Sequence, residues 1–351
     1  MTTLAATLQQ IREPDRHVAA QAQRLLDNKT KPRRSLGRLE DIACQVAAIR
    51  GTTAPGPARK AIVVMAGDHG VADESVSAYP QAVTRQMLLN FASGGAAINV
   101  LARNAGARLV VVDMGVVEPV DAPGVRAVRI AAGTRNFVHG PAMTRDEAIA
   151  AIEAGIAIAE ELVAGGINLI GLGEMGIANT TSASALAAVL TGAPLDNVTG
   201  RGTGLDDAGI ARKRTVIRRA IDANRPDPDD ALDVLAKLGG LEIAGLVGVT
   251  LGGAAAGVPI IVDGFICGAA ALVARRLSPA AGGALLCSHR SVEIGHRSVL
   301  AALDRQPLFD LDLRLGEGTG AALAMSLVDA ALAILHDMAT FAAAGVSDSG
   351  A

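Results

Sequence analysis

An isolated acid, Glu317, stands between two glycines, immediately before a long apolar segment of the sequence. Glycine allows a backbone to approach a ligand closely, and a carboxylate held at such a position could act as a general base. An acid near a helix start also complements the helix dipole, which would be a purely structural role. The residue types around Glu317 therefore predict either a catalytic base or a stabilising charge at a helix terminus.

Two other segments have residues suited to binding a phosphate. Asn-Thr-Thr-Ser at 179–182 places four polar side chains at a predicted helix start, where backbone N–H groups favour anions. The spacing Gly200-x-Gly202-x-Gly204 predicts a backbone nest for an anion, and Lys213 lies about two helical turns further on as a counter-charge. The structural alternatives are a capping cluster in the first segment and a flexible loop in the second.

The segment before residue 179 matches the dinucleotide fingerprint in its spacing, Gly171-x-Gly173-x-x-Gly176. Glu174 lies inside this turn and would repel a pyrophosphate. Asp196, twenty residues beyond the last glycine, follows no predicted second strand and is poorly placed to bind a ribose. These two features favour a single phosphate or a ribose over an NAD cofactor.

Two acids follow predicted strands directly, in the segments Asp263-Gly264 and Asp68-His69. Ligands of open α/β sheets bind at the carboxyl ends of the strands, so both acids are candidates for ligand contacts. Asp263 could equally cap the next helix. Asp68 and His69 could perform acid–base chemistry, bind a metal or order their loop.

His289, Glu293 and His296 have the spacing i, i+4, i+7, which would place three possible metal ligands on one helix face. The pattern is neither H-E-x-x-H nor H-x-x-E-H, so polar packing is the favoured interpretation. The sequence also has no P-loop and no G-x-S-x-G nucleophile motif. We therefore expect no metal and no other cofactor.

The composition favours a small-molecule ligand over a nucleic acid. The chain has 351 residues, a net charge of −3 and only 2% aromatic residues, without tryptophan and with one tyrosine. Its basic residues form no broad run, and aromatic side chains that could stack on bases are scarce. We expect a core of alanine, leucine, valine and isoleucine, and no nucleic-acid partner.

The expected location is the cytoplasm. The three cysteines are far apart in the sequence, and residues 1–17 lack the basic and apolar regions of a signal peptide. Residues 243–262 carry no charge and imitate a membrane span. Because this stretch contains five glycines and a proline, it is better read as a buried helix followed by a short strand, at 259–262, with no membrane span.

Short apolar runs that alternate with alanine-rich helical segments predict a Rossmann-like parallel sheet with helices on both faces. The predicted strands are 61–66, 108–113, 167–171, 259–262 and 284–287. Residues 1–50 contain no predicted strand; there we expect helices, one of them capped by Ser35, and a buried helix from Gly320 to about Phe341. We expect a small helical domain from residues 1–55 and 320–351, and a large α/β domain with the active site at 56–319.

Taken together, these segments resemble one family, the nicotinate-nucleotide–dimethylbenzimidazole phosphoribosyltransferases of the cobalamin lower-ligand pathway. The resemblance covers residues 31–325, in the family's order, and rests on the following motifs: KPRRSLGRLE, AGDHGV, GTRNF, GEMGIANTTSASAL, TGRGTGLDD, VDGFICGAAAL, SHRSVEIGH and LRLGEGTGAALA. One departure is Arg34, where the family usually has glycine, so the conformation of that turn is in question.

The resemblance implies transfer of a 5-phosphoribosyl group from nicotinate mononucleotide to 5,6-dimethylbenzimidazole, with inversion at C1′. By the same resemblance, Glu317 is the general base and Glu174 lies near the reacting sugar. No pyrophosphate leaves in this reaction, so no Mg²⁺ is needed to neutralise one. The family also implies a homodimer. The remaining alternatives are a non-catalytic nucleotide-binding module and an NAD-dependent oxidoreductase.

The resemblance further implies two sets of binding residues. Two further nucleotide candidates come from the residue patterns described above: Gly202 from the glycine nest and Asp263 from the strand end. The full set of nucleotide and phosphate candidates is Gly176, Asn179, Thr180, Gly202, Lys213, Asp263, Gly264, Ser291, Arg314 and Gly316. The candidates for the benzimidazole pocket are Ser77, Tyr79, Pro80, Gln86, Met175 and Leu315. Tyr79 could also be an ordinary loop aromatic.

Overall fold

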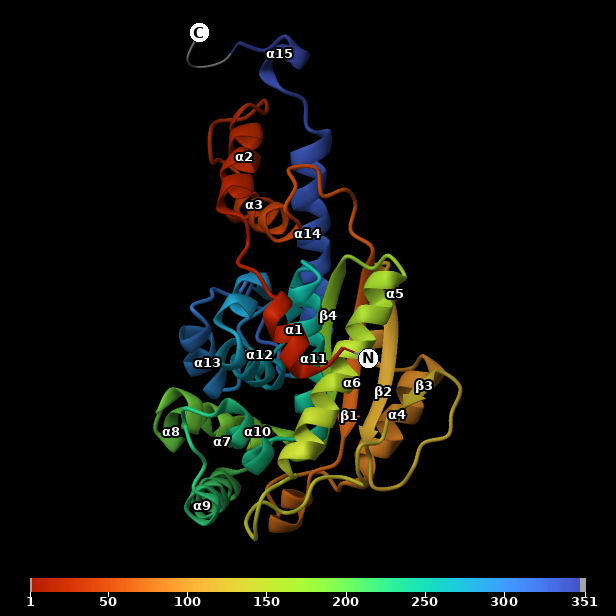
Figure 1. The fold of residues 1–351 in the computed structure, drawn as a ribbon, viewed down its shortest axis with the longest axis vertical. Coiled ribbons are helices and arrows are strands. Elements are labelled where there is room, and N and C mark those ends of the chain that lie inside the picture. The colour runs from red at the N-terminus through yellow and green to blue at the C-terminus, as the bar shows by residue number, and fades with distance from the viewer. Residues whose placement is uncertain (1, 348–351) are drawn as a thin grey trace.

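The centre of the molecule is a six-stranded parallel sheet (Figure 1). The computed structural model describes residues 2–347. The order of the strands across the sheet is β3-β2-β1-β4-β5-β6. Their bounds are β1 (Lys60–Gly67), β2 (Arg108–Gly115), β3 (Val125–Ala127), β4 (Leu169–Met175), β5 (Ile260–Val262) and β6 (Leu285–Cys287). The predicted α/β class with a parallel sheet is confirmed.

Helices connect the strands and cover both faces of the sheet. The helices of the first half are α1 (Leu4–Gln10), α2 (Arg16–Asp27), α3 (Arg38–Arg50), α4 (Ala82–Ser93), α5 (Ala97–Asn104), α6 (Arg145–Ala164) and α7 (Asn179–Thr191). Those of the second half are α8 (Leu195–Val198), α9 (Asp207–Asn224), α10 (Ala231–Leu238), α11 (Leu241–Ala255), α12 (Phe265–Leu277), α13 (Gly295–Leu303), α14 (Thr319–Asp337) and α15 (Phe341–Ala344). Two short 3₁₀ helices lie at Gly70–Glu74 and Pro279–Ala284.

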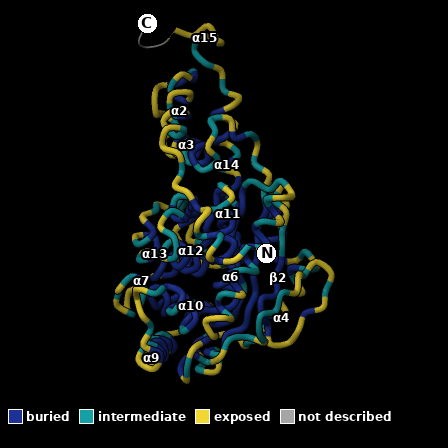
Figure 2. Tube along the Cα trace, in the orientation of Figure 1, coloured by how far each residue is buried: buried dark blue, intermediate teal, exposed yellow. Residues whose placement is uncertain are grey.

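Alternate side chains of β1 enter two separate hydrophobic cores, one on each face of the sheet. The strands of the sheet are mostly buried, whereas many of the connecting loops are exposed (Figure 2). Val63 and Met65 pack with side chains of α6 and α11. Val64, between them, packs on the opposite face with side chains of α5 and α14. A strand that is apolar at every position is thus explained by burial on both faces.

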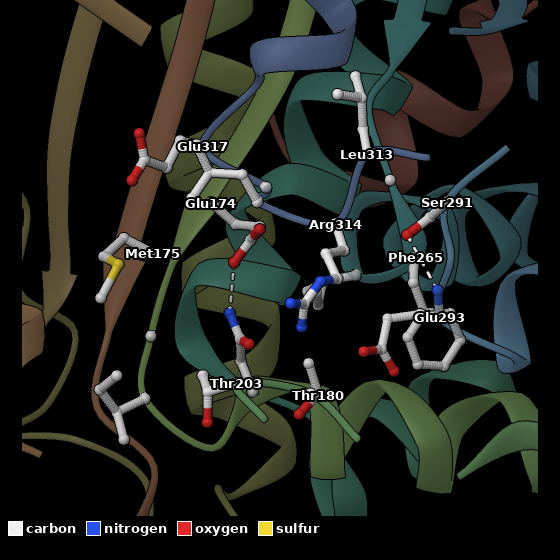
Figure 3. Close-up of a pocket in the computed structure, with 18 of the residues that line it drawn as sticks. Glu174, Met175, Thr180, Thr203, Phe265, Ser291, Glu293, Leu313, Arg314 and Glu317 are labelled. Carbon is white, nitrogen blue, oxygen red and sulfur yellow. Dashed lines mark hydrogen bonds between the residues drawn. The ribbon is translucent and has the colours of Figure 1, made fainter. Parts of the chain in front are cut away.

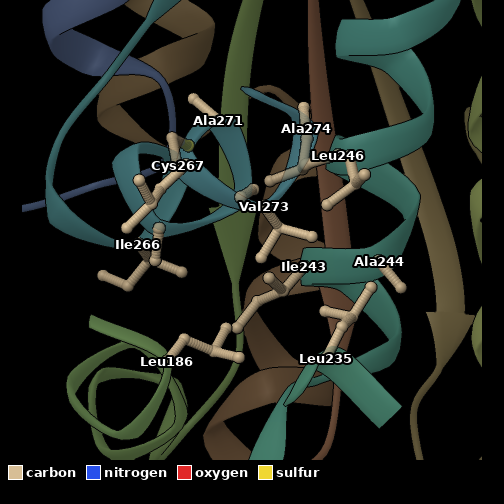
Figure 4. Close-up of a cluster of buried hydrophobic side chains, with 14 of the residues drawn as sticks. Leu186, Leu235, Ile243, Ala244, Leu246, Ile266, Cys267, Ala271, Val273 and Ala274 are labelled. Carbon is tan, nitrogen blue, oxygen red and sulfur yellow. The ribbon is translucent and has the colours of Figure 1, made fainter. Parts of the chain in front are cut away.

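The first of these cores depends on the close packing of α6 against α11. A Cβ on Gly155 of α6 or on Gly248 of α11 would clash with the backbone of the facing helix. Figure 4 shows the other side of α11, where Ile243 and Leu246 meet α10 and α12. The charge-free stretch at 243–262 is therefore a buried helix followed by a strand, as predicted.

Helix α14 is long and apolar enough to cross a membrane by length and composition alone. It packs against β4, α5 and α3. Its buried residues belong to the same hydrophobic core as Val64 of β1. This packing accounts for its hydropathy, and the prediction of a buried helix after Gly320 is confirmed. The helix ends at Asp337, before the predicted Phe341, which begins α15.

Helices α2 and α3 pack against each other and against α14, at the end of the molecule where the described chain also ends (Figure 1). Helix α1, in contrast, packs against α6 and α11, and the backbone N–H of Leu4 donates to Glu153. Helix α1 was predicted to belong to the small helical domain, but it packs with the helices that cover the sheet. Residues 348–351 of that assignment lie outside the described residues.

The turn before α3 differs from the prediction at Ser35 and keeps a glycine-like backbone at Arg34. Ser35 does not cap α3: the helix begins at Arg38 after Gly37, whose φ of 52° ends a tight turn, and the cap has no side-chain hydrogen bond. Arg34 adopts a φ of 61°, the left-handed conformation that glycine favours, and its guanidinium bonds Asp41 at 2.8 Å. The turn thus keeps a glycine-like backbone with arginine in place.

Strand β4 is longer than predicted and β3 was missed. Gly171 and Gly173 lie inside β4, where a side chain would meet the α14 helix and the backbone of Glu317, respectively. The fingerprint spacing therefore does not form a dinucleotide-binding turn here, and these two glycines instead allow close packing of α14 on the sheet. Strand β3 has three residues, two of them exposed, and so lacks an apolar run that would reveal it.

Candidate active site

The loop before α14 holds three successive residues in the left-handed conformation. Their φ angles are 82° for Gly316, 62° for Glu317 and 86° for Gly318. Glycine adopts this conformation readily, but glutamate does so only at a cost of about 1–3 kcal/mol. Backbone strain of this kind is concentrated at functional sites, so the loop geometry singles out the Glu317 carboxylate.

Asp263, at the end of β5, holds this loop and the start of α14. Its Oδ2 accepts from the N–H of Gly318 and its Oδ1 from the N–H of Ala321, both at 3.1 Å. The side chain is fully buried, and burial raises its pKa to about 7. Asp263 is therefore a capping residue for α14, and it is not among the described residues that line the cavity.

The Glu317 carboxylate is buried but incompletely paired. Only 6% of the residue is exposed, and its Oε2 has no hydrogen-bond partner among the residues that the structure describes. Burial raises the pKa of Glu317, and the backbone N–H of Ile98 partly offsets the increase. A carboxylate with a raised pKa and a free oxygen is suited to accept a proton from a ligand.

Glu174 occupies the middle of the site, at the end of β4. Its carboxylate accepts a hydrogen bond from the side-chain amide of Asn179, the first residue of α7 (Figure 3). Burial raises the pKa of Glu174 to about 8, although the bond from Asn179 opposes the shift. A Cβ on Gly316 would clash with this carboxylate. Because Gly316 has no side chain, the loop that carries Glu317 packs directly against Glu174.

Lys213 provides a buried positive charge beside the start of α7. Its side chain is fully buried on α9, and its Nζ donates to Thr180 Oγ1 at 2.7 Å. Burial lowers its pKa to about 8, and the charge of Glu293 opposes that effect. A Cβ on Gly202 would lie 3.4 Å from the ammonium, so Lys213 does reach the glycine-rich loop. It is not a solvated surface lysine.

These residues surround one cavity of about 630 Å³. In Figure 3, Glu317 and Met175 lie at one end, Glu174 and Arg314 in the middle, and Thr180, Ser291 and Glu293 toward the other end. The predicted site residues that line it are Glu317, Glu174, Gly176, Asn179, Thr180, Gly202, Gly264, Ser291, Arg314, Gly316, Tyr79, Met175 and Leu315. The structure thus brings together segments from residue 79 to residue 317.

Some predicted residues lie just outside this lining. Lys213 donates a hydrogen bond to Thr180, and Ser77 contacts the hydroxyl of Thr203; both Thr180 and Thr203 line the cavity. Pro80 and Gln86 are not among the lining residues. On α4 the cavity is lined instead by Val83 and Met87. These two are four residues apart and share one helix face, a periodicity that would have identified them in place of Gln86.

The sequence interpretation also missed several lining residues that follow strands or precede α14. They are Ile177, Thr203, Phe265, Ile266, His289, Glu293, Asp312 and Leu313. Most of them are next to a predicted residue in the sequence. Whether such a neighbour lines the cavity depends on the direction of its side chain, which the sequence did not show. His289 and Glu293 had been noted for their spacing, but neither had been assigned a role.

His289, Glu293 and His296 do not share a helix face, because α13 begins only at Gly295. In the part of the chain that the structure describes, no group of three or more histidine, cysteine, aspartate or glutamate side chains is arranged to hold a metal ion. His69 is fully buried and bonds Glu242 at 2.7 Å and Ser182 at 3.0 Å. Its neighbour Asp68 accepts from the N–H of Val117, so both residues order their loop.

Comparisons with known proteins agree with this geometry. The family model described as "Phosphoribosyltransferase" matches residues 11–346. A nicotinate-nucleotide–dimethylbenzimidazole phosphoribosyltransferase of Chloroflexus aggregans is 54% identical over 349 residues, which is 99% of each chain. One of Geobacter metallireducens is 54% identical over 347 residues, which is 99% of this chain and 98% of the relative.

The fold is also that of a solved structure of CobT from Thermus thermophilus. The two superpose with a TM-score of 0.91 at 49% sequence identity, covering 95% of this chain and 100% of the other. A second structure from this organism, described as the nicotinate-nucleotide–dimethylbenzimidazole enzyme, superposes with a TM-score of 0.90. The chain therefore belongs to the nicotinate-nucleotide–dimethylbenzimidazole phosphoribosyltransferase family.

Proposed function

We propose that this chain transfers the 5-phosphoribosyl group of nicotinate mononucleotide to 5,6-dimethylbenzimidazole, with Glu317 as general base. The observation that carries the assignment is the Glu317 carboxylate, which is buried, strained and free at Oε2 beside the apolar end of the cavity. The names of the relatives described above support the same pair of substrates.

The proposed step moves one ribosyl group and one proton. A ring nitrogen of the benzimidazole attacks C1′ from the face opposite nicotinate, and the C1′–N bond to the pyridinium breaks. The bonding electrons neutralise the pyridinium, so nicotinate leaves without a positive ring charge. The N–H proton of the benzimidazole passes to Glu317. Inversion at C1′ gives α-ribazole 5′-phosphate.

Glu174 is placed to stabilise the positive charge that develops on the sugar. Burial raises the pKa of Glu174 to about 8 in the empty cavity, so a neutral carboxyl is favoured there at pH 7. A bound pyridinium, or an oxocarbenium in the transition state, opposes this effect and favours the carboxylate. Glu174 would thus become charged when a cation occupies the middle of the cavity.

The phosphate would bind at the end that contains Lys213 and Thr180. The ammonium and the Thr180 hydroxyl are already 2.7 Å apart and lie beside Gly202. Backbone N–H groups at the start of α7 add further donors. Ser291, Gly264 and Arg314 complete the proposed nucleotide contacts, and Met175, Leu315 and Tyr79 form the proposed base pocket with Val83 and Met87.

Incubation with nicotinate mononucleotide and a panel of aromatic bases tests this function, with nicotinate and the ribosylated base measured by mass. We expect equimolar release of the two products with dimethylbenzimidazole. The panel includes benzimidazole and adenine, because pocket shape decides between such bases. Tight binding of the nucleotide without turnover of any base would instead indicate a nucleotide-binding module.

We also propose that the chain acts as a homodimer in the cytoplasm, with residues 1–55 and 320–351 as a small domain and 56–319 as a large one, except that α1 belongs with the large domain because it packs against α6 and α11. Support for self-association comes from large apolar side chains exposed near the cavity, among them Val292, Ile294 and Leu315. Contiguous exposed apolar surface is typical of protein interfaces. Sedimentation equilibrium at several concentrations tests the oligomeric state, and a monomer at all of them would contradict it.

A further inference from the structure

Two side chains of the cavity, Glu293 and His289, have no role in the function proposed above. Glu293 is only 8% exposed, and its Oε2 has no hydrogen-bond partner among the described residues. Its carboxylate lies on the cavity wall on the side of Thr180 (Figure 3), with Oε2 against Gly200, where a Cβ would clash with it. An ionised carboxylate can only accept hydrogen bonds, so this wall presents an acceptor that lacks a donor.

The hydrogen bonds around His289 determine which of its ring nitrogens carries the proton. The Ser288 hydroxyl donates its only hydrogen to the backbone carbonyl of Asp263, at 3.0 Å. The contact between Ser288 Oγ and His289 Nδ1, at 2.9 Å, must therefore be donated by Nδ1–H. Burial lowers the pKa of His289 to about 4, so the ring is neutral at pH 7 and Nε2 keeps its lone pair.

This lone pair belongs to the cavity wall. His289 lines the cavity, and a Cβ on Gly264 would lie 3.6 Å from Nε2, in ordinary contact with it. The ring stacks on Phe309 with centroids 5.9 Å apart and planes 17° from parallel, which holds its orientation. His289 and Glu293, on either side of Ser291, thus provide two hydrogen-bond acceptors near the proposed nucleotide contacts.

Nicotinate mononucleotide has few donors to offer them. Near neutral pH its phosphate is largely a dianion, since the second pKa of a phosphate monoester is about 6. Its carboxylate is ionised and its pyridinium nitrogen carries no hydrogen. Only the two ribose hydroxyls can donate. The phosphate, in contrast, requires donors such as Lys213 and Thr180.

We infer that Glu293 and His289 accept hydrogen bonds from the ribose hydroxyls of the bound nucleotide and thereby select ribonucleotides over deoxyribonucleotides. This inference rests on the proposed function for the identity of the nucleotide. Its physical basis is that a buried acceptor without a donor is costly, so a substrate lacking the hydroxyl is rejected.

Binding constants measured without any base test the inference, because deoxygenation also changes the intrinsic reactivity of the sugar. Calorimetry with nicotinate mononucleotide and its 2′-deoxy and 3′-deoxy analogues requires no variant. A bond to a charged acceptor predicts about tenfold to a hundredfold weaker binding of the analogue that lacks the hydroxyl facing Glu293. A smaller loss, of a few-fold, is expected for the hydroxyl facing neutral His289.

Variants then identify the partner of each hydroxyl. Glu293→Met removes the acceptor at similar length and should bind the ribonucleotide and one deoxy analogue equally weakly. Glu293→Gln, a more conservative change, should retain part of the preference. His289→Phe keeps the stack on Phe309 and should lose discrimination at the other hydroxyl only. Asp222→Asn removes an exposed carboxylate outside the cavity lining and serves as the control.

Two outcomes would overturn the inference. One is equal affinity of the wild type for all three nucleotides. The other is that Glu293→Met weakens all three equally and abolishes the preference for the nucleotide over its unphosphorylated riboside, which would mean that Glu293 acts through the charge of Lys213. Hydroxyl selectivity in binding without nicotinate release in the turnover assay would contradict the proposed function instead.

Discussion

The two ends of the cavity differ in how firmly their residues are held. At the nucleotide end, Lys213 is fully buried and Thr180 and Asn179 begin a helix inside the core. At the base end, Tyr79 and Leu315 are 55% and 58% exposed, and both lie in loops. A buried charge that is already hydrogen-bonded needs little reordering when a phosphate binds, whereas exposed loop side chains must be ordered by the base.

This difference indicates a division of labour between the two substrates. The nucleotide end is preorganised for one charged ligand, and small changes there should have large effects on its affinity. The base end recognises an uncharged aromatic ring mainly through apolar contact, so it should tolerate both substitutions and related bases. Glu317 lies toward the base end, near Met175, but it is far more buried than Tyr79 or Leu315, since only 6% of the residue is exposed.

The largest expected effect is at Glu317. Glu317→Gln should lower kcat by about 10²–10⁴-fold, because the amide cannot take a proton from the base. Glu317→Gly should be equally inactive, yet thermal unfolding should occur at the same or a higher temperature, because glycine relieves the strain of a φ of 62°. Steady-state rates and thermal melts measure both effects. Near wild-type kcat in either variant would remove Glu317 as the base.

Substitution of the buried cation should affect one substrate only. Lys213→Met should raise KM for nicotinate mononucleotide by about tenfold to a hundredfold and leave KM for the base unchanged. Arg218→Met removes a charge from an exposed position on the same helix and should change neither constant. Equal increases in both KM values for Lys213→Met would contradict the separation of the two ends.

The same lysine predicts a pH dependence. Burial lowers the pKa of Lys213 to about 8 in the free protein, so the ammonium is present below that pH and is lost above it. The value of kcat/KM for the nucleotide should therefore fall as the pH rises through about 8. In Lys213→Met this decline should be reduced. An unchanged profile in the variant would assign the titration to another group.

Glu174 should affect stability in the opposite sense to an ordinary surface acid. Burial raises the pKa of Glu174 from 4.5 to about 8, so the folded state holds a proton that the unfolded state has lost. This contribution is complete below pH 4.5 and disappears as the pH rises through 8. Glu174→Gln should lose less stability than the wild type between pH 5 and 9, by about a few °C in Tm. Parallel melting curves across that range would contradict this.

The smallest effect is expected at the exposed end. Tyr79→Ala should raise KM for dimethylbenzimidazole by about two- to fivefold, because only part of its ring is removed from water, and should leave KM for the nucleotide unchanged. Leu89→Ala, an exposed apolar residue outside the cavity lining, provides a control. If Tyr79→Ala changes neither constant, Tyr79 is an ordinary loop aromatic.

The sequence predicted the parallel sheet, five of its strands and most of the residues that line the cavity. These predictions succeeded because apolar strands, helix starts and glycine-rich loops are local features, and because the motifs occur in a familiar order. The ends of β4 were less predictable, since the pattern of Gly171 and Gly173 is the same in a phosphate-binding turn and in a strand packed closely against a helix.

The roles of single polar side chains were decided only by the tertiary structure. Asp263 was predicted to contact the nucleotide, yet it caps α14, which begins more than fifty residues later in the chain. Val83 lines the cavity and Gln86 does not, because only one face of α4 borders the cavity. Lys213 could have been a surface lysine until the packing of α9 buried it beside Thr180.

By itself, then, the sequence determined the fold class, the family to which the chain is similar and the position of Glu317 between two glycines. The tertiary structure decided which acids are buried, which carboxylate oxygens remain unpaired among the described residues and which side chain His289 contacts through Nδ1. The physical reason is that secondary structure follows from local periodicity and backbone preference. Burial and hydrogen-bond pairing depend on residues that are distant in the chain and meet only when it folds.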